Sequence, residues 1–297
     1  MSLKQALSQA RKVLEEKNIE DASLEGELLL RHALQINRAQ LYSDLERELS
    51  PKEEATFWHL IERRLKGEPT AYITGHREFY GLDFYVDSRV LIPRPESELL
   101  VEKALELAQS RHIDTIADIG TGCGAIAISL ALNLPQTKIY ATDISAPALE
   151  IAQINCYKHG VVDRVCLLYG DMLDPLPEPI DLIIANLPYV REAELPRTGP
   201  ASFEPKVALN GGPAGLEKIR RLCQQAKGKL GSQGCLLLEI GQGQGKAVTA
   251  FLRRLFPSAS PTLTPDLSGI ERVVSLCLTP KSTDAKLVNW VLPGDKD

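Results

Sequence analysis

The stretch Asp118–Ile128, DIGTGCGAIAI, decides the fold class of this chain. It carries an apolar strand predicted over residues 115–120 into a helix predicted over residues 125–134. Its three glycines let the backbone turn sharply and approach a bound molecule closely. Their spacing also fits the loose dinucleotide pattern G-x-G-x-x-G/A, which by itself is a weak signal. Because the loop follows the first strand of an alternating series, we interpret it as a nucleotide-binding loop.

Strand and helix patterns alternate through the rest of the chain. Further strands are predicted at residues 138–143, 164–171, 181–186, 234–241 and 272–278, and further helices at 147–157, 216–230 and 247–256. Apolar strands that alternate with amphipathic helices predict a parallel sheet covered by helices on both faces. The fold class is therefore α/β, and we place this domain at residues 94–297, with a loose tail from about residue 279.

Two smaller units precede the α/β domain. A helical domain is predicted over residues 1–74, because apolar residues recur at helical spacing and Ser50 before Pro51 is typical of a helix start. Its mixed-charge face is either a plain surface or a docking surface. Residues 75–93 are rich in aromatic and β-branched residues and are interrupted by Gly81, which predicts a β-hairpin linker.

The composition limits the class of protein. The 297 residues include 34 basic and 39 acidic side chains, so the net charge of −5 argues against a non-specific nucleic-acid binder. The six cysteines form no C-x-x-C pair and no zinc spacing, which predicts no metal site and buried thiols in a reducing compartment. The N-terminus is too charged for a signal peptide, and no run of about 20 apolar residues could cross a membrane. We expect a cytoplasmic protein.

Two further positions support an adenosine site. Asp143 ends the second strand, 23 residues after Gly120, where a carboxylate can accept hydrogen bonds from ribose hydroxyls; its alternative role is a helix N-cap. Asp171 follows the third strand, where it could receive an adenine amino group while Met172 packs on the ring. A turn with a core methionine is an equal alternative for that pair. The cofactor is a nicotinamide dinucleotide or S-adenosylmethionine.

The segment Asn186–Tyr189, NLPY, favours methyl transfer to a planar nitrogen. The lone pair of an amide or base amine is delocalised, so two fixed hydrogen-bond acceptors are needed to aim it. The side-chain oxygen of Asn186 and the backbone carbonyl of Leu187 can supply them and stabilise the developing positive charge. Pro188 stiffens the backbone, and Tyr189 offers a flat face to the target group.

This segment resembles the (Asn/Asp)-Pro-Pro-(Tyr/Phe/Trp) motif of amino-methyltransferases. Other stretches narrow the resemblance. They are KGEPTAYITGHREFYGLDFYVDSRVLIPRPESELLVE, DIGTGCGAIAI, NLPYV, FEPKVALNGGPAGL, LEIGQGQ and DLSGIERVV. Together, over about residues 66–276, they resemble the HemK/PrmC family. Members of that family methylate the side-chain amide of the glutamine in the Gly-Gly-Gln motif of peptide chain release factors.

The resemblance implies a Rossmann-like class I methyltransferase domain that uses S-adenosylmethionine, preceded by the helical domain and the hairpin. The cofactor-binding positions that it implies are Gly120, Thr121, Gly122, Cys123, Gly124, Asp143, Asp171, Met172 and Asn186. The catalytic and substrate-binding clamp that it implies is Asn186, Leu187, Pro188 and Tyr189. Arg94, near the mouth of the site, is also expected to bind the substrate. Leu187 departs from the family, which usually has proline there, and this puts the rate of turnover in question.

The resemblance also implies the partners. A release factor is expected to dock on the helical domain of a monomeric enzyme, with no stable nucleic acid and no membrane involved. The alternative is a DNA adenine or cytosine amino-methyltransferase. Such an enzyme would need a basic region to recognise its DNA target, and this acidic chain has no obvious region of that kind.

Overall fold

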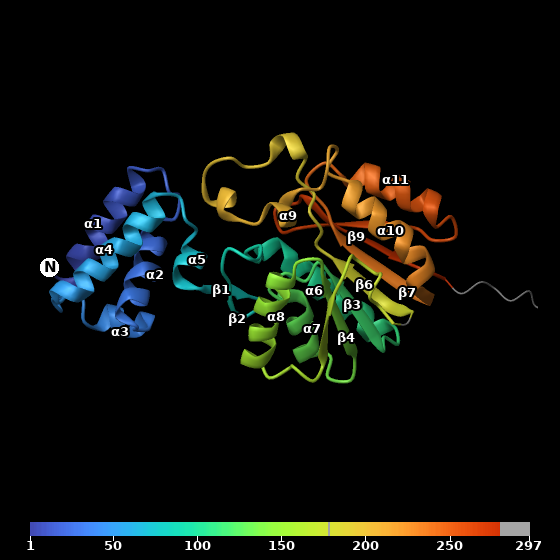
Figure 1. Ribbon diagram of the computed structural model, residues 1–297, viewed down its shortest axis with the longest axis horizontal. Coiled ribbons are helices and arrows are strands. Elements are labelled where there is room, and N and C mark those ends of the chain that lie inside the picture. Colours follow the sequence, from blue (N-terminus) through green and yellow to red (C-terminus); the bar gives the residue numbers. More distant parts are fainter. Residues whose placement is uncertain (178, 280–297) are drawn as a thin grey trace, which may run out of the picture.

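The computed structural model describes residues 1–177 and 179–279 and places a small helical unit beside a larger sheet domain (Figure 1). The helical unit consists of α1 (Leu3–Glu15), α2 (Ala22–Leu34), α3 (Arg38–Ser43), α4 (Pro51–Leu65) and α5 (Thr70–Thr74). Reciprocal capping boxes start three of these helices, at Ser2, Asn37 and Ser50. The expected start at Ser50, with proline at the first helical position, is therefore confirmed.

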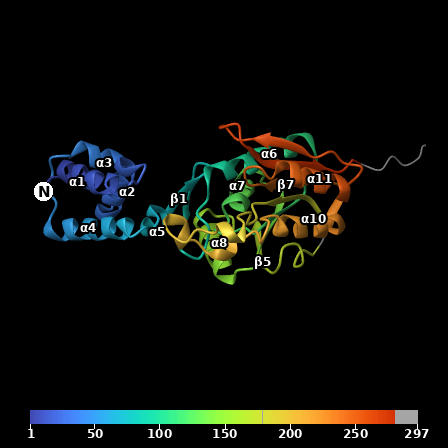
Figure 2. The ribbon, with the colours of Figure 1, turned by 90° about the horizontal axis from the view of Figure 1, so that it is seen from above.

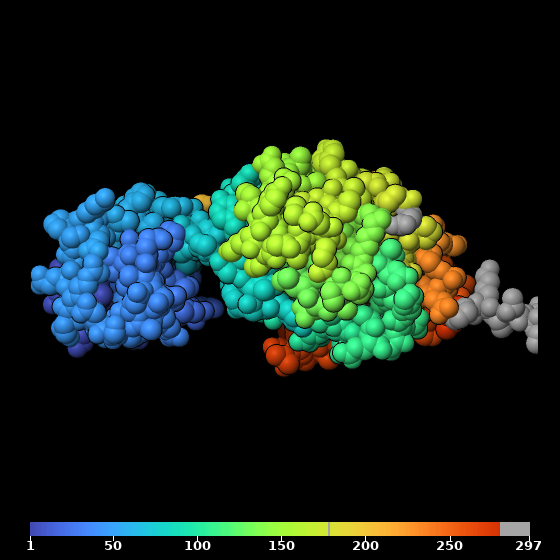
Figure 3. All heavy atoms as spheres, turned by 90° about the horizontal axis from the view of Figure 1, so that it is seen from below, coloured from blue at the N-terminus to red at the C-terminus, as the bar shows by residue number. Residues whose placement is uncertain are grey.

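The helical unit has its own apolar core. Leu3, Ala6, Ala10 and Leu14 line the buried face of α1, and they pack with buried residues of α2 and α4. Seen from above and from below, the unit joins the rest of the chain through a narrow junction at α5 and the hairpin (Figures 2 and 3). The boundary at residue 74 remains a prediction.

The predicted hairpin is present as β1 (His76–Phe79) paired antiparallel with β2 (Leu82–Tyr85). The turn between them needs two positive φ angles, 53° at Tyr80 and 71° at Gly81. Phe79 and Phe84 are buried within the apolar cluster that covers one face of the large sheet. The hairpin is thus packed onto the sheet domain and is more than a connecting segment.

Seven strands form the large sheet, in the order β5-β4-β3-β6-β7-β9-β8. Their bounds are β3 (Thr115–Ile119), β4 (Lys138–Asp143), β5 (Val165–Tyr169), β6 (Ile180–Ala185), β7 (Leu230–Glu239), β8 (Thr262–Pro265) and β9 (Glu271–Cys277). The five strands from β5 to β7 are parallel to one another, as the sequence predicted. The predicted parallel sheet also contains antiparallel pairing at β9, which runs antiparallel to β7 and β8. After α11, β8 runs in the same direction as β7, and the short link from β8 to β9 then reverses the chain, so that β9 lies antiparallel between them.

Helices cover both faces of the sheet. The longer ones are α6 (Glu98–Ser110), α7 (Ala125–Asn133), α8 (Ala146–Lys158), α10 (Glu217–Lys229) and α11 (Gly245–Leu255), and the short ones are η1 (Pro95–Ser97), η2 (Glu192–Glu194), η3 (Pro200–Phe203) and α9 (Lys206–Leu209). Apolar residues of α6, α7 and α8 share one buried cluster, and those of α10 and α11 share the other. None of the described helices is long and apolar enough to cross a membrane.

The cysteines differ from the expectation of six buried thiols. Cys123, Cys156 and Cys223 are buried and free, but Cys166 is exposed. Cys235 and Cys277 form a disulfide between β7 and β9. The two residues are direct partners in the antiparallel register, which brings their side chains together across 42 residues of sequence. The tail predicted from about residue 279 lies, beyond Thr279, outside the described residues.

Candidate functional site

A cleft opens at the carboxyl ends of β3, β4 and β6, where open α/β sheets bind ligands. It encloses about 780 Å³, including its open mouth. Its walls are formed by Arg89, Val90, Leu91, Ile119, Gly120, Gly122, Thr142, Asp143, Ile144, Ser145, Ala148, Asp171, Met172, Asn186, Leu187, Pro188, Val207, Ala208 and Lys218. Eight of the residues predicted from the sequence therefore meet in one place, although they come from four separate segments.

The glycine loop adopts the conformation that its sequence predicted. Gly120, Gly122 and Gly124 have φ angles of 72°, 56° and 84°, which strain any residue with a side chain. A Cβ at Gly120 would lie 3.3 Å from Cδ2 of Leu187, on the cleft side of the loop. A Cβ at Gly124 would lie 3.1 Å from Cδ1 of Ile128. Gly124 therefore serves the close packing of the following helix, while Gly120 and Gly122 face the cleft.

Thr121 and Cys123 stabilise the loop from beneath and do not line the cleft. The Thr121 hydroxyl donates a hydrogen bond of 2.6 Å to Oδ2 of Asp118, a buried carboxyl whose pKa burial raises to about 6. The carbonyl of Cys123 accepts a hydrogen bond of 2.9 Å from Nδ2 of the buried Asn155. We did not single out Asp118 or Asn155 from the sequence, although Asp118 begins the glycine stretch.

Asp143 lies at the end of β4, with its carboxylate against the glycine loop. Its Oδ2 accepts a hydrogen bond of 3.0 Å from the backbone N–H of Gly122, and its Oδ1 accepts one of 2.8 Å from Ser145. Burial raises its pKa, and these backbone donors oppose that shift. The N-cap of α8 is Ser145, whose hydroxyl accepts from Ala148, so the alternative reading of Asp143 as the cap is wrong. Asp143 instead ties the glycine loop to the end of β4.

Asp171 and Met172 both line the cleft, two and three residues beyond the end of β5. Asp171 forms an ion pair with Arg221 of α10. Met172 has a φ of 51°, and its carbonyl accepts a hydrogen bond of 3.0 Å from the hydroxyl of Thr142. The turn that we weighed as an alternative is real, and it is the turn that places both side chains on the cleft.

Asn186 follows β6 at the floor of the cleft. Its Nδ2 donates a hydrogen bond of 2.9 Å to Oγ of Ser97, and the Ser97 hydroxyl donates one of 2.6 Å to Oε2 of Glu239. This leaves the side-chain oxygen of Asn186 as the end of the amide available to a ligand. The sequence reasoning missed Ser97 and Glu239, although both lie in the quoted stretches PESE and LEIG.

The rest of the NLPY segment divides between the cleft and the core. Leu187 is 5% exposed and, with Pro188, lines the cleft beside Gly120. Tyr189 does not line the cleft: its ring packs so closely on Gly241 that a Cβ there would lie 3.0 Å from it. Burial raises the pKa of Tyr189 to about 12. Leucine in place of the family's proline therefore adds a side chain that packs against the glycine loop.

Arg94 lies outside the cleft walls. Its guanidinium forms hydrogen bonds of 2.6 and 2.8 Å to the buried carboxylate of Glu204, which also accepts from the backbone N–H of Ile92. Glu204 follows η3 in the segment 191–204, and this segment reaches the helical unit, where a Cβ at Gly67 would lie 3.4 Å from Phe203. Arg94 thus holds the segment between the two units.

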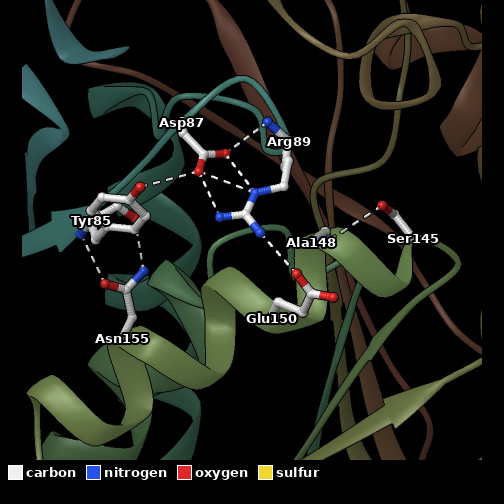
Figure 4. Close-up of polar contacts among 7 residues, drawn as sticks. All are labelled: Tyr85, Asp87, Arg89, Ser145, Ala148, Glu150 and Asn155. Atoms are coloured by element: carbon white, nitrogen blue, oxygen red, sulfur yellow. Dashed lines mark hydrogen bonds and ion pairs between the residues drawn. The ribbon is translucent and has the colours of Figure 1, made fainter. Parts of the chain in front are cut away.

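Arg89 was also missed by the sequence reasoning. Its guanidinium forms hydrogen bonds with Asp87 and, at 2.8 Å, with Glu150 of α8 (Figure 4). Next to it, Tyr85 and Asn155 exchange two hydrogen bonds, of 2.8 and 3.0 Å, between the hairpin and α8 (Figure 4). This double attachment fixes the loop after the hairpin, whose residues 89–91 form one wall of the cleft.

The chain matches two family models. The model described as the PrmC N-terminal domain matches residues 5–75, and the one described as the methyltransferase small domain matches residues 95–198.

Within residues 1–177 and 179–279, no group of three or more histidine, cysteine, aspartate or glutamate residues could hold a metal ion.

Curated relatives are similar over nearly the whole chain. A release factor glutamine methyltransferase of Moorella thermoacetica is 46% identical over 92% of this chain and 97% of its own. That of Koribacter versatilis is 42% identical over 92% and 98%, and that of Geobacter sulfurreducens is 39% identical over 92% and 95%.

Solved methyltransferases share the fold. The hMettl16 catalytic domain has a TM-score of 0.54 and 18% identity, covering 68% of this chain and 79% of its own. A 16S rRNA N2 G1207 methyltransferase of T. thermophilus has a TM-score of 0.50 and 15% identity, covering 69% and 50%. At these identities the likeness establishes the class I methyltransferase fold alone.

Proposed function

This chain belongs to the family of release factor glutamine methyltransferases, and on that premise we propose its reaction. It transfers a methyl group from S-adenosylmethionine to the side-chain amide nitrogen of the glutamine in the Gly-Gly-Gln motif of peptide chain release factors. The observation that carries the proposal is the Asn186 amide at the floor of the cleft, with its nitrogen held by Ser97 and its oxygen left for a ligand.

The residues of the cleft fit S-adenosylmethionine. Gly120 and Gly122 expose backbone to the cofactor, and a Cβ at Gly120 would narrow the cleft. Asp143, which contacts Gly122, accepts hydrogen bonds from the ribose hydroxyls. Ile144 and Met172 offer apolar surface for the adenine ring, and Asp171 offers a carboxylate for its amino group. When bound, the cofactor supplies a methyl group on a positively charged sulfur, which an amide nitrogen can attack.

The protein's contribution is to orient the target amide. Two acceptors, Oδ1 of Asn186 and the carbonyl of Leu187, take the two N–H groups of the glutamine and direct its lone pair toward the methyl group. They also stabilise the positive charge that develops on nitrogen, as fixed dipoles do without reorganising. Pro188 restricts the conformation of the residue before it. Tyr189 packs on Gly241 and so supports residues 186–189. Arg94 supports the same residues indirectly, because it anchors the segment 191–204 that follows them.

A direct experiment separates the two substrate classes. The purified enzyme is incubated with labelled S-adenosylmethionine and either release factor, release factor with the motif glutamine replaced by glutamate, or duplex DNA. We expect label only in the intact release factor, on the amide of that glutamine. Label in DNA and not in release factor would establish the alternative. Equal label in the glutamate variant would refute the motif glutamine as the methylated residue.

Recognition of the release factor is assigned to the helical domain. A second cleft lies between α2, α5 and the hairpin, and Leu24 of α2, 48% exposed, stands on its wall. An exposed leucine beside a cleft is a reasonable contact for a protein partner. Because release factors act in the cytoplasm, we place the enzyme there as well, as a monomer that meets its partner transiently.

Leu24→Glu is expected to raise the Michaelis constant for release factor about tenfold, through loss of roughly 1.4 kcal/mol of apolar contact. The affinity for S-adenosylmethionine should not change, because Leu24 lies outside the cofactor cleft. Leu132→Glu, at a leucine 41% exposed on α7, is the matched control and should leave both constants unaltered. If the two variants show the same Michaelis constant, the helical domain does not dock the substrate through this cleft.

A further inference from the structure

A buried chain of hydrogen bonds links the Asn186 amide to a carboxyl group at the end of β7. Asn186 donates to Ser97 of η1, and Ser97 donates to Glu239. Ser97 and Glu239 are 3% and 2% exposed, respectively. The chain joins three elements far apart in sequence, and the two-acceptor arrangement does not itself require Ser97 or Glu239.

The hydrogen atoms of this chain can be counted. An ionised carboxylate only accepts hydrogen bonds, so Glu239 takes the single hydroxyl hydrogen of Ser97. The Ser97 oxygen can then only accept, and the only donor on the Asn186 side chain is Nδ2. The carboxylate therefore excludes the flipped amide, in which Oδ1 would face Ser97 and Nδ2 would face the target.

We propose that Glu239 and Ser97 are positioning residues that keep the oxygen of Asn186 directed at the target amide, and that protonation of Glu239 releases this control. The inference rests on the proposed function. A protonated Glu239 can donate to Ser97, which frees the hydroxyl hydrogen to donate to Oδ1 of Asn186. The amide is then free to turn, and its NH₂ group would oppose the NH₂ group of the glutamine.

The surroundings of Glu239 place this titration in an accessible range. Burial is the largest influence and raises its pKa to about 7, and the nearby Glu96 of η1 acts in the same direction. Arg272 of β9 opposes the shift, as do hydrogen bonds from Ser97 and Tyr189. Because the carboxylate is the active form, the rate should be full above pH 7 and should fall as the pH drops through that value.

The test is the pH profile of single-turnover methylation of release factor at saturating cofactor, from pH 5.5 to 9. The parent enzyme should show an acid limb near pH 7. Glu239→Gln should lose that limb and react about tenfold or more slowly at pH 8, because an amide does not fix the direction of the Ser97 hydrogen. Ser97→Ala should show a similar loss, and Ser97→Thr, which keeps the hydroxyl, should recover most of the rate.

Controls separate positioning from folding. Ser129→Ala removes a buried hydroxyl of α7 that donates to the carbonyl of Ala125, and it should leave the pH profile unchanged. Thermal unfolding and calorimetric binding of S-adenosylmethionine identify any variant that fails to fold. A parent enzyme that does not label release factor at any pH refutes the proposed function. A parent that does, with the same acid limb in Glu239→Gln or an unreduced rate in Ser97→Ala, refutes this inference alone.

Discussion

Asn186→Ala is expected to lower the single-turnover rate of methyl transfer to release factor about a hundred- to a thousandfold. Removal of one preorganised hydrogen-bonding group lowers the rates of other enzymes by a similar factor. The alanine variant removes the acceptor that holds one N–H of the target amide. The lone pair is then aimed only by the carbonyl of Leu187. The variant should still bind S-adenosylmethionine with affinity close to the parent, because the ribose and adenine contacts are intact.

Asn186→Asp tests whether the hydrogen-bond acceptor at this position matters more than the amide itself. It keeps an acceptor toward the target and should lose less activity than the alanine variant. Its second oxygen replaces the Nδ2 donor to Ser97, so two carboxyl groups then share one hydroxyl hydrogen. We therefore expect the rate of this variant to rise as the pH falls and one carboxyl group takes up a proton. An alanine variant that turns over like the parent would contradict the two-acceptor mechanism, even in a proven methyltransferase.

Asp143→Ala should weaken S-adenosylmethionine binding by about 1.5–3 kcal/mol, the usual value for hydrogen bonds to a charged group. The loss has two sources. The ribose hydroxyls lose their acceptor, and the backbone N–H groups of Gly122 and Ser145 lose theirs, which loosens the glycine loop. Isothermal calorimetry measures the change directly.

Asp143→Asn refines this result. An asparagine can still accept from Ser145 but must turn a donor toward Gly122, so it should bind with intermediate affinity. Asp163→Ala, at an exposed aspartate remote from the cleft, should bind as the parent does. Equal affinity in folded Asp143→Ala and in Asp163→Ala would remove Asp143 from the cofactor site.

Much of the site could be predicted because its residues are local to recognisable elements. The glycine loop and Asn186 each follow a strand of the same parallel series, and Asp143 ends another. Parallel strands bring their carboxyl ends to one edge of the sheet. Position along the chain therefore predicted position in space. The same logic failed at β9, where a tight connection to β8 reversed the strand, and at Cys235 and Cys277, which only the resulting register makes neighbours.

The sequence by itself determined the order of strands and longer helices in the α/β domain from β3 onward, except for the short strand β8, as well as the loop that turns through three glycines and the family to which the chain belongs. Each of these depends on residues close together in the chain. Only the tertiary structure decided which groups hold the Asn186 amide. Ser97 lies 89 residues before it, and Glu239 lies 142 residues beyond Ser97. A hydrogen bond needs atoms within about 3 Å, and no spacing in the sequence indicates such a contact.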